Sequence, residues 1–505
     1  MRRFCLALLL LASPAFAQPD RYELGRRVIA FEKAWDEKAD DAAAKKRAAP
    51  IINRAVQSFF QLNLSNASKF IDEARNALEA PEAASASVRW SEALQIVPET
   101  RVVDSTTEDV TVAVKSFYKV DGEAPKGAIA RAKLGAGKPV EVTLDKLPAT
   151  IKVPVKSVPG TPSADFTLVV EIVVDGKVLA RKETRVSRIE KFEERLAVVK
   201  KASADVPNPP MTIEQATLLL IVKQLESLAK KSVPETDLPA SRLIFGAERL
   251  STVKEPYYTS KRPGEFWLSI PTGKTVSVVR IRIPAKLEEK KTPVPILFAL
   301  HGMGGSENLF FDSYGDGIVP RLATERGWIV VAPRVEGLLG SGPAPKVSEI
   351  LDELAKRYPI DPKRVYLVGH SMGAGHALQL AQKDPERYAA IAALGGGGRV
   401  AKADTLKGRF FVGCGKMDFA LNGAKSLHKS LDDAKVPVTL KEYDDIEHLL
   451  IVREAAADVF KFFEDTRPKS FTAKTPRAQR RRSESCLLCA LRTTIRSTSR
   501  FGVMI

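Results

Sequence analysis

One serine of this sequence lies between two glycines in a pattern typical of a catalytic nucleophile. Gly369, Ser371 and Gly373 form a G-x-S-x-G motif between an apolar run and a helical pattern. In this context the motif predicts a sharp turn that holds the serine hydroxyl clear of a sheet. A Cβ atom on either glycine would collide with the chain, and Gly375 is expected to let the following helix pack closely on the strands. An ordinary turn with an incidental serine is the alternative.

A serine hydroxyl becomes a nucleophile when a base removes its proton. The chain has five histidines. His448 follows the last expected strand and precedes the last expected helix, so it is the candidate base. The others have different expected roles: His301 orders a loop, His370 and His376 are packing or solvent-facing residues, and His428 lies on a helix surface.

The base needs a carboxylate partner that fixes its tautomer and stabilises its charged form. Asp418 lies in the loop after the apolar run 410–413, which gives the chain order Ser, Asp, His. Asp444 and Asp445 are the alternatives. They lie so close to His448 in the chain that solvation of a loop is their simpler role.

Backbone N–H groups are the expected donors to a tetrahedral oxyanion. Met372, directly after the serine, supplies one of them. Met303 or Gly302, in the loop after the apolar run 294–300, supplies the second, although this loop is alternatively a flexible connector. Such donors stabilise the transition state because they point to the place where negative charge develops.

The first 17 residues have the features of a secretory signal peptide. Two arginines precede an apolar run, and Ala15-Phe16-Ala17 forms a small-x-small cleavage site. The mature protein is therefore expected to be secreted or periplasmic. No other stretch approaches the roughly 20 apolar residues of a membrane span.

The formal net charge of +17 is concentrated at the chain ends. Residues 467–505 contain ten Lys or Arg and one Glu without hydrophobic periodicity, which predicts a disordered basic tail. The rest is weakly basic, without aromatic residues among the basic ones, so no nucleic-acid partner is expected. Cys486 and Cys489 supply only two of the four ligands of a structural zinc site. We expect no metal and no cofactor.

The elements that must position the site lie in residues 262–466, where apolar strand runs alternate with helical patterns. This alternation predicts a mostly parallel sheet with helices on both faces. Upstream, residues 18–96 and 189–261 have helical patterns, and residues 27–48 suit one long exposed helix. Short strand runs over 97–188 predict a small β-sandwich. It is either inserted in one helical region or simply flanked by it.

Two quoted stretches resemble a known family. "HGMGGSEN" and "IDPKRVYLVGHSMGAGHAL" place residues of about 270–465 close to the α/β-hydrolase superfamily. They resemble secreted esterases related to polyhydroxybutyrate depolymerases and dienelactone hydrolases, and the catalytic domain of prolyl oligopeptidase-type peptidases. The resemblance implies an α/β hydrolase fold with Ser371, Asp418 and His448 as an acyl-serine triad. Ala374 departs from the second consecutive glycine of several relatives, which leaves the subfamily open.

Three functions compete. The first is a secreted carboxylic ester hydrolase, the second a prolyl oligopeptidase-type serine peptidase, and the third a non-catalytic binding protein. Such peptidases usually carry a β-propeller, for which the strand region is too short, and a complete triad argues against the third. The glycine-rich segment 395–408 offers no lid, so we expect an open cleft and short-acyl or polymer-linked ester substrates. The physiological substrate and the oligomeric state stay open.

Overall fold

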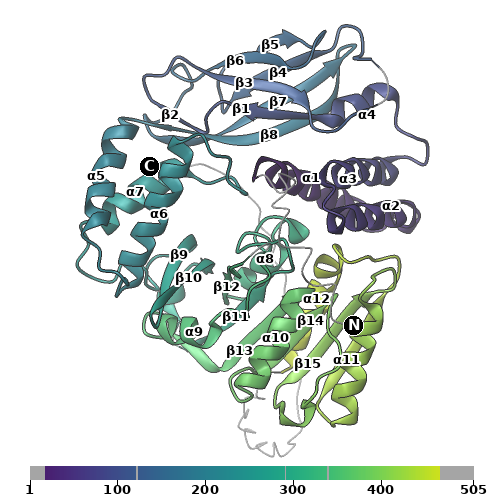
Figure 1. Cartoon of the computed structure of the whole chain (residues 1–505), viewed down its shortest axis with the longest axis vertical. Coiled ribbons are helices and arrows are strands. Elements are labelled where there is room, and N and C mark those ends of the chain that lie inside the picture. Colours follow the sequence, from purple (N-terminus) through teal and green to yellow (C-terminus); the bar gives the residue numbers. More distant parts are fainter. Residues whose placement is uncertain (1–17, 121–122, 291, 338–339, 467–505) are drawn as a thin grey trace, which may run out of the picture. The chain divides into compact units, whose positions relative to one another are not determined.

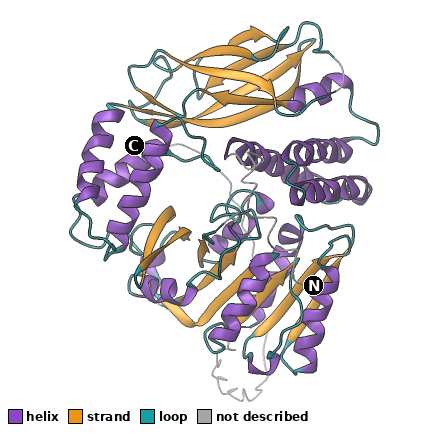
Figure 2. Ribbon diagram, viewed as in Figure 1, coloured by secondary structure: helices purple, strands orange, loops and turns teal. Residues whose placement is uncertain are grey.

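The computed structural model describes residues 18–120, 123–290, 292–337 and 340–466. The C-terminal part of the described chain is built around an eight-stranded sheet (Figures 1 and 2). Its order is β16-β15-β14-β13-β11-β12-β10-β9, and only β10 runs opposite to its neighbours. The mostly parallel sheet predicted from the sequence is thereby confirmed. The strands are β9 (Gly264–Thr272), β10 (Thr275–Ile283), β11 (Val294–Leu300), β12 (Ile329–Pro333), β13 (Ile360–His370), β14 (Ala390–Leu394), β15 (Arg409–Gly415) and β16 (Val438–Tyr443).

Helices cover both faces of this sheet because its strands are apolar on both sides. In β11, Ile296 and Phe298 enter one hydrophobic core, whereas Leu297 and Ala299 enter the other. This is the period of two that a strand imposes on its side chains. The first core includes α9 (Val347–Ala355), α10 (Met372–Lys383) and α11 (Leu421–Asp433), and the second includes α8 (Ile318–Glu325) and α12 (Ile451–Asp465).

The N-terminal helices α1 (Gln18–Glu37), α2 (Ala42–Phe60) and α3 (Leu64–Glu79) pack against the second core. The prediction of one long exposed helix over 27–48 is wrong. The helix breaks before Asp41, whose side chain caps α2. Phe31 and Trp35 are fully buried in one cluster with Trp328, which adjoins β12. The charged residues of α1 alternate with apolar ones, and its apolar face packs against the core on one side of the large sheet.

The strands upstream form a β-sandwich, as predicted. A three-stranded sheet contains β1 (Leu94–Pro98), β3 (Asp109–Ser116) and β6 (Ala149–Pro154). A five-stranded sheet contains β2 (Val102–Asp104), β8 (Lys177–Ile189), β7 (Ala164–Val174), β4 (Ile129–Leu134) and β5 (Val140–Thr143). Val112 and Ile151 of the first sheet share a core with Leu168 and Ile172 of the second. The short helix α4 (Ala86–Ala93) leads into β1.

Two separate helical groups flank the sandwich in the chain. The first group is α1 to α3, and the second consists of α5 (Phe192–Ala204), α6 (Ile213–Ala229) and α7 (Ala240–Leu250). Leu225 and Ile244 of this group lie in the first core with Leu268 of β9. The sandwich therefore lies, in the chain, between helices that pack on opposite faces of the large sheet. The described residues also include the short 3₁₀ helices η2 (Leu287–Glu289), η3 (Tyr314–Asp316) and η5 (Ala403–Thr405).

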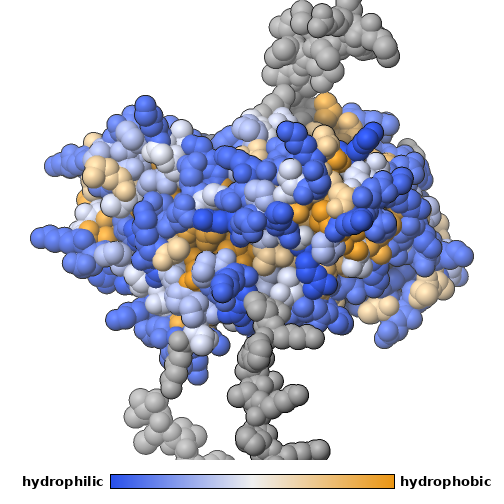
Figure 3. Space-filling model, turned by 90° about the horizontal axis from the view of Figure 1, so that it is seen from below, coloured by the Kyte–Doolittle hydropathy of each residue, from blue (hydrophilic) through white to orange (hydrophobic). Residues whose placement is uncertain are grey.

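The face shown in Figure 3 is mostly hydrophilic, with apolar patches between charged side chains. Within the described ranges, no helix has the length and apolar character needed to cross a membrane. The expected signal peptide and basic tail lie outside the described residues.

Candidate active site

Ser371 lies in the sharp turn between β13 and α10, with φ 55° and ψ −118°. Such a conformation is strained for a residue with a side chain. A Cβ on Gly369 would lie 2.2 Å from the Gly373 carbonyl oxygen, and one on Gly373 would lie 2.0 Å from the Leu300 carbonyl oxygen. Both glycines are therefore required, as predicted. The packing role predicted for Gly375 is wrong, because no atom lies within 4 Å of a Cβ built there.

The structure brings Ser371, His448 and Asp418 together in one hydrogen-bonded chain. Nε2 of His448 lies 2.9 Å from the Ser371 Oγ, and its Nδ1 lies 2.9 and 3.1 Å from the two Asp418 carboxylate oxygens. Burial acts to raise the pKa of Asp418, but the hydrogen bond with His448 brings it below its ordinary value. Asp444 instead pairs with Lys416 at 2.6 Å in an exposed loop. A carboxylate on Nδ1 leaves Nε2 free to accept the serine proton.

The two predicted oxyanion donors lie near the serine. Met372 is the first residue of α10, so its N–H has no acceptor within the helix. Met303 lines the same cavity as Ser371. A Cβ on Gly302 would lie 3.2 Å from the Ser371 Cβ. Gly302 and Met303 both line the cavity, so both stay candidates for the second donor.

His301 orders the loop after β11, as predicted. Its Nε2 accepts a hydrogen bond from the Val335 N–H at 3.0 Å, and its Nδ1 donates to the Gly302 carbonyl oxygen at 2.9 Å. Burial lowers the pKa of His301. The neutral ring can therefore bond both segments at once, which holds Gly302 in place.

His370 is more than the packing residue expected from the sequence. Its buried ring accepts a hydrogen bond from the Tyr314 hydroxyl at 2.5 Å and donates to the His448 carbonyl oxygen at 2.8 Å. Burial lowers the pKa of His370 to about 3, which keeps the ring neutral. His376 is buried on α10, and His428 lies half-buried on α11. The sequence did not reveal the hydrogen bond between Tyr314 and His370, because the two residues are 56 positions apart in the chain.

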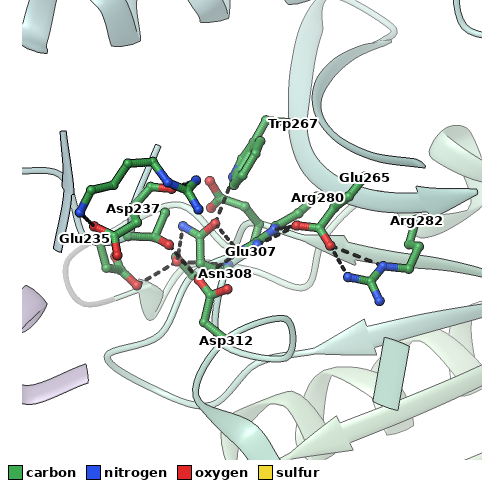
Figure 4. Close-up of polar contacts among 12 residues, drawn as sticks. Glu235, Asp237, Glu265, Trp267, Arg280, Arg282, Glu307, Asn308 and Asp312 are labelled. Atoms are coloured by element: carbon green, nitrogen blue, oxygen red, sulfur yellow. Dashed lines mark hydrogen bonds and ion pairs between the residues drawn. The ribbon is translucent and has the colours of Figure 1, made fainter. Parts of the chain in front are cut away.

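A polar network holds the segment that follows the loop 301–305 after β11 (Figure 4). Arg280 of β10 lies between Glu265, whose Oε1 is 2.5 Å away, and Asp312, whose Oδ2 is 2.8 Å away. Asn308 accepts hydrogen bonds at 2.8 Å from the Trp267 indole and at 3.1 Å from Arg280. Charge-assisted bonds of this kind are the strong ones in proteins. They tie the segment to β9 and β10.

The N-terminal helix α1 also holds the loop 301–305. Arg21 donates to the Gly304 carbonyl oxygen at 2.5 Å and pairs with Glu235 at 3.1 Å. Gly304 has φ +81°, and a Cβ there would lie 2.6 Å from the Phe59 ring of α2. The loop next to Met303 is therefore fitted to residues that precede the sandwich in the chain.

A cavity of about 420 Å³ reaches the serine. Ser371 and His448 line it together with side chains from α1, α2 and α3, among them Ile29 and Val56. Segment 395–408, in which no lid was expected, contains only the short helix η5. The N-terminal helices form one side of the cavity, which the sequence did not indicate. The preference for short acyl groups stays a prediction. Among the side chains that the structure describes, no group of three His, Cys, Asp or Glu could hold a metal ion.

A family model described as alpha/beta hydrolase fold matches residues 295–409. The strand order around Ser371 and this match define the fold of the C-terminal part: it is the α/β hydrolase fold, preceded by helices and a β-sandwich, as predicted.

Similar proteins include a bifunctional acetylxylan esterase/xylanase of Neocallimastix patriciarum. It is 33% identical over 108 residues, which cover 20% of this chain and 16% of that protein. A solved ferulic acid esterase has 18% identity and a TM-score of 0.35, covering 41% of this chain and 99% of its own. An S-formylglutathione hydrolase from Agrobacterium tumefaciens has 19% identity and a TM-score of 0.33, covering 41% and 96%.

Proposed function

We propose that this protein hydrolyses carboxylic esters through an acyl-serine intermediate. The hydrogen-bonded chain from Ser371 through His448 to Asp418, with its two distances of 2.9 Å, is the observation that carries the proposal. The similarity to an acetylxylan esterase/xylanase supports an ester as the bond that is cleaved. Short-range geometry of this kind is what nucleophilic catalysis by serine requires.

In the first half of the reaction, the Ser371 Oγ attacks the ester carbonyl carbon while His448 Nε2 accepts the hydroxyl proton. Asp418 stabilises the imidazolium that forms. The N–H groups of Met372 and of Met303 or Gly302 donate to the oxyanion of the tetrahedral intermediate. When the intermediate collapses, the bond to the alkoxy oxygen breaks, and His448 returns the proton to the leaving alcohol.

The second half of the reaction repeats these steps with water as the nucleophile. His448 accepts a proton from the water, whose oxygen attacks the acyl carbon attached to Ser371. Collapse of the second tetrahedral intermediate releases the carboxylic acid and returns the proton to the Ser371 Oγ. Neither half needs a metal or an organic cofactor.

The substrate is a small-molecule or polymer-linked ester outside the cytoplasm. The signal peptide predicted from the sequence of the first 17 residues supports export of the mature chain. A prolyl oligopeptidase-type activity is less favoured. The strands between 94 and 189 form one three-stranded and one five-stranded sheet around a common core, which is a sandwich rather than the repeated blades of a propeller.

Ser371→Ala tests this function. The purified variant is expected to fold with an unchanged melting temperature and to lose about 10⁶-fold in kcat, as in comparable triads. A fluorophosphonate probe is expected to label the wild type and the control Ser430→Ala, whose serine lies on α11, but not Ser371→Ala. Ester hydrolysis that persists in Ser371→Ala would overturn the proposal. Faster turnover of a peptide panel than of p-nitrophenyl esters would assign the peptidase instead.

A further inference from the structure

We propose that helices α1, α2 and α3 form a binding compartment within the cavity at Ser371, which takes an alkyl or aryl group of the ester substrate. This inference rests on the proposed function of Ser371. The three helices lie outside the residues that match the hydrolase family model. The compartment is therefore a property of this chain and its N-terminal segment.

These helices contribute several apolar side chains to the cavity, beside Arg21 and Arg26 of α1. Ile29 comes from α1, Ile52 and Val56 from α2, and Ala67 and Ile71 from α3, and all of them line the cavity that also reaches Ser371. The cavity of about 420 Å³ lies within the range of small-molecule sites. A polar substrate group placed against these side chains would lose its hydrogen bonds with water and gain none in return, which costs free energy.

Several of the charged groups that line the cavity pair with one another. Arg280 is bound by Glu265 and Asp312, and on α1 Arg21 is bound by Glu235 and Arg26 by Asp237. These pairs need no charged ligand to neutralise them. The apolar side chains of α2 and α3 therefore offer the new favourable contact, which favours an uncharged, apolar substrate group.

Aromatic side chains continue this apolar surface to the base. The Phe60 ring of α2 lies 5.4 Å from the Phe419 ring, and Phe419 lies 4.3 Å from the His448 imidazole, measured between centroids. Phe60 and Phe419 are 42% and 63% exposed, and Met303 nearby in the cavity is 44% exposed. A gathering of exposed large apolar side chains marks a binding site more often than scattered ones do. Here it borders the reacting atoms.

The length of the substrate's apolar group must then affect catalysis. Each CH₂ group that leaves water for the apolar side chains of these helices raises kcat/KM by up to about fourfold, from the transfer free energy of a methylene. Two ester series show whether the apolar group that binds belongs to the acyl part or to the alcohol part of the ester. One is p-nitrophenyl esters from acetate to octanoate, and the other is acetate esters of alcohols from methanol to octanol.

Three variants test the compartment. Val56→Phe fills the cavity from α2, and Ile29→Phe fills it from α1, where the half-buried position tolerates a larger side chain. Gln57→Phe is the matched control, because Gln57 is the exposed neighbour of Val56 on the same helix and lies outside the cavity lining. Melting temperatures identify a variant that fails to fold, and Ile29→Phe then carries the test.

We expect kcat/KM of the wild type to rise at least tenfold along one of the two series. The filling variants are expected to lose at least tenfold on the longest ester of that series and less than threefold on the shortest, whereas Gln57→Phe stays within twofold. A flat response in both series overturns the compartment, as does an equal loss on short and long esters. If Ser371→Ala still hydrolyses the esters, the proposed function itself fails, which is a separate outcome.

Discussion

The Nε2–H of His370 donates a hydrogen bond to the backbone carbonyl oxygen of His448, with 2.8 Å between the two atoms. The residue before the nucleophile thus holds the backbone of the proposed base. The Tyr314 hydroxyl, 2.5 Å from Nδ1, fixes the tautomer that can donate in this way. The base is therefore positioned from both sides, by Asp418 on its ring and by His370 on its main chain.

His370→Phe removes this hydrogen bond and keeps a ring of similar size. We expect kcat to fall about 10²-fold with little change in KM, because a small displacement of a catalytic group has an effect of this size. Steady-state kinetics separate the two constants. Tyr314→Phe removes only the hydrogen bond that fixes the His370 tautomer, so it is expected to have a smaller effect on kcat. An unchanged kcat in His370→Phe contradicts the positioning role.

Asp418→Asn is expected to lower kcat about 10⁴-fold, because an amide on Nδ1 favours the wrong imidazole tautomer. Asp444→Asn serves as the control. Asp444 pairs with Lys416 in an exposed loop, so its substitution is expected to leave kcat within twofold. The two rates are compared at one pH with one ester. The reverse pattern would make Asp444 the acid.

Two glycines of the nucleophile turn are expected to respond oppositely to alanine. Gly373→Ala forces a Cβ to within 2.0 Å of the Leu300 carbonyl oxygen, so it should displace the serine and abolish activity or folding. Gly375→Ala meets open space in α10 and should stabilise the protein by about 0.5–1 kcal/mol. Urea denaturation and ester hydrolysis measure both effects. Destabilisation by Gly375→Ala would restore its discarded packing role.

Trp35 is expected to anchor α1 to the hydrolase part of the chain. It is fully buried, and its indole N–H donates to Glu454 of α12 at 2.8 Å. Trp35→Ala should lower the free energy of unfolding by about 3–5 kcal/mol. Val198→Ala on α5, where the valine is 64% exposed, should change it by less than about 0.5 kcal/mol. If the two substitutions changed the free energy of unfolding equally, α1 would contribute little to the stability of the core.

Glu447 is expected to make stability depend on pH. Burial raises the pKa of Glu447 to about 7, above its unfolded value of about 4.3. The folded state therefore holds this proton more tightly, so the stability that the proton contributes is present at low pH and is lost as the pH rises towards 7. Between pH 5 and 8, the wild type should lose about 2–3 kcal/mol more than Glu447→Gln. Parallel stability curves would contradict this expectation.

Local patterns were sufficient for the nucleophile turn and for most of the large sheet. Gly369 and Gly373 are dictated by contacts within the turn and with the adjacent strand, so the motif and its apolar flanks reveal them. Strand β11 was predicted to the residue because a strand buried on both faces is a continuous apolar run. Asp418 and His448 were found from their order and from the strands that precede them.

The helical side of the cavity at Ser371 and the fixation of its base were decided by tertiary structure alone. Helices α1 to α3 reach the cavity although about 300 residues separate Val56 from Ser371 in the chain. Helical periodicity shows that a helix has an apolar face, but it does not show which surface that face meets. The same holds for Tyr314 and His370, whose hydrogen bond depends on two segments that only folding brings together.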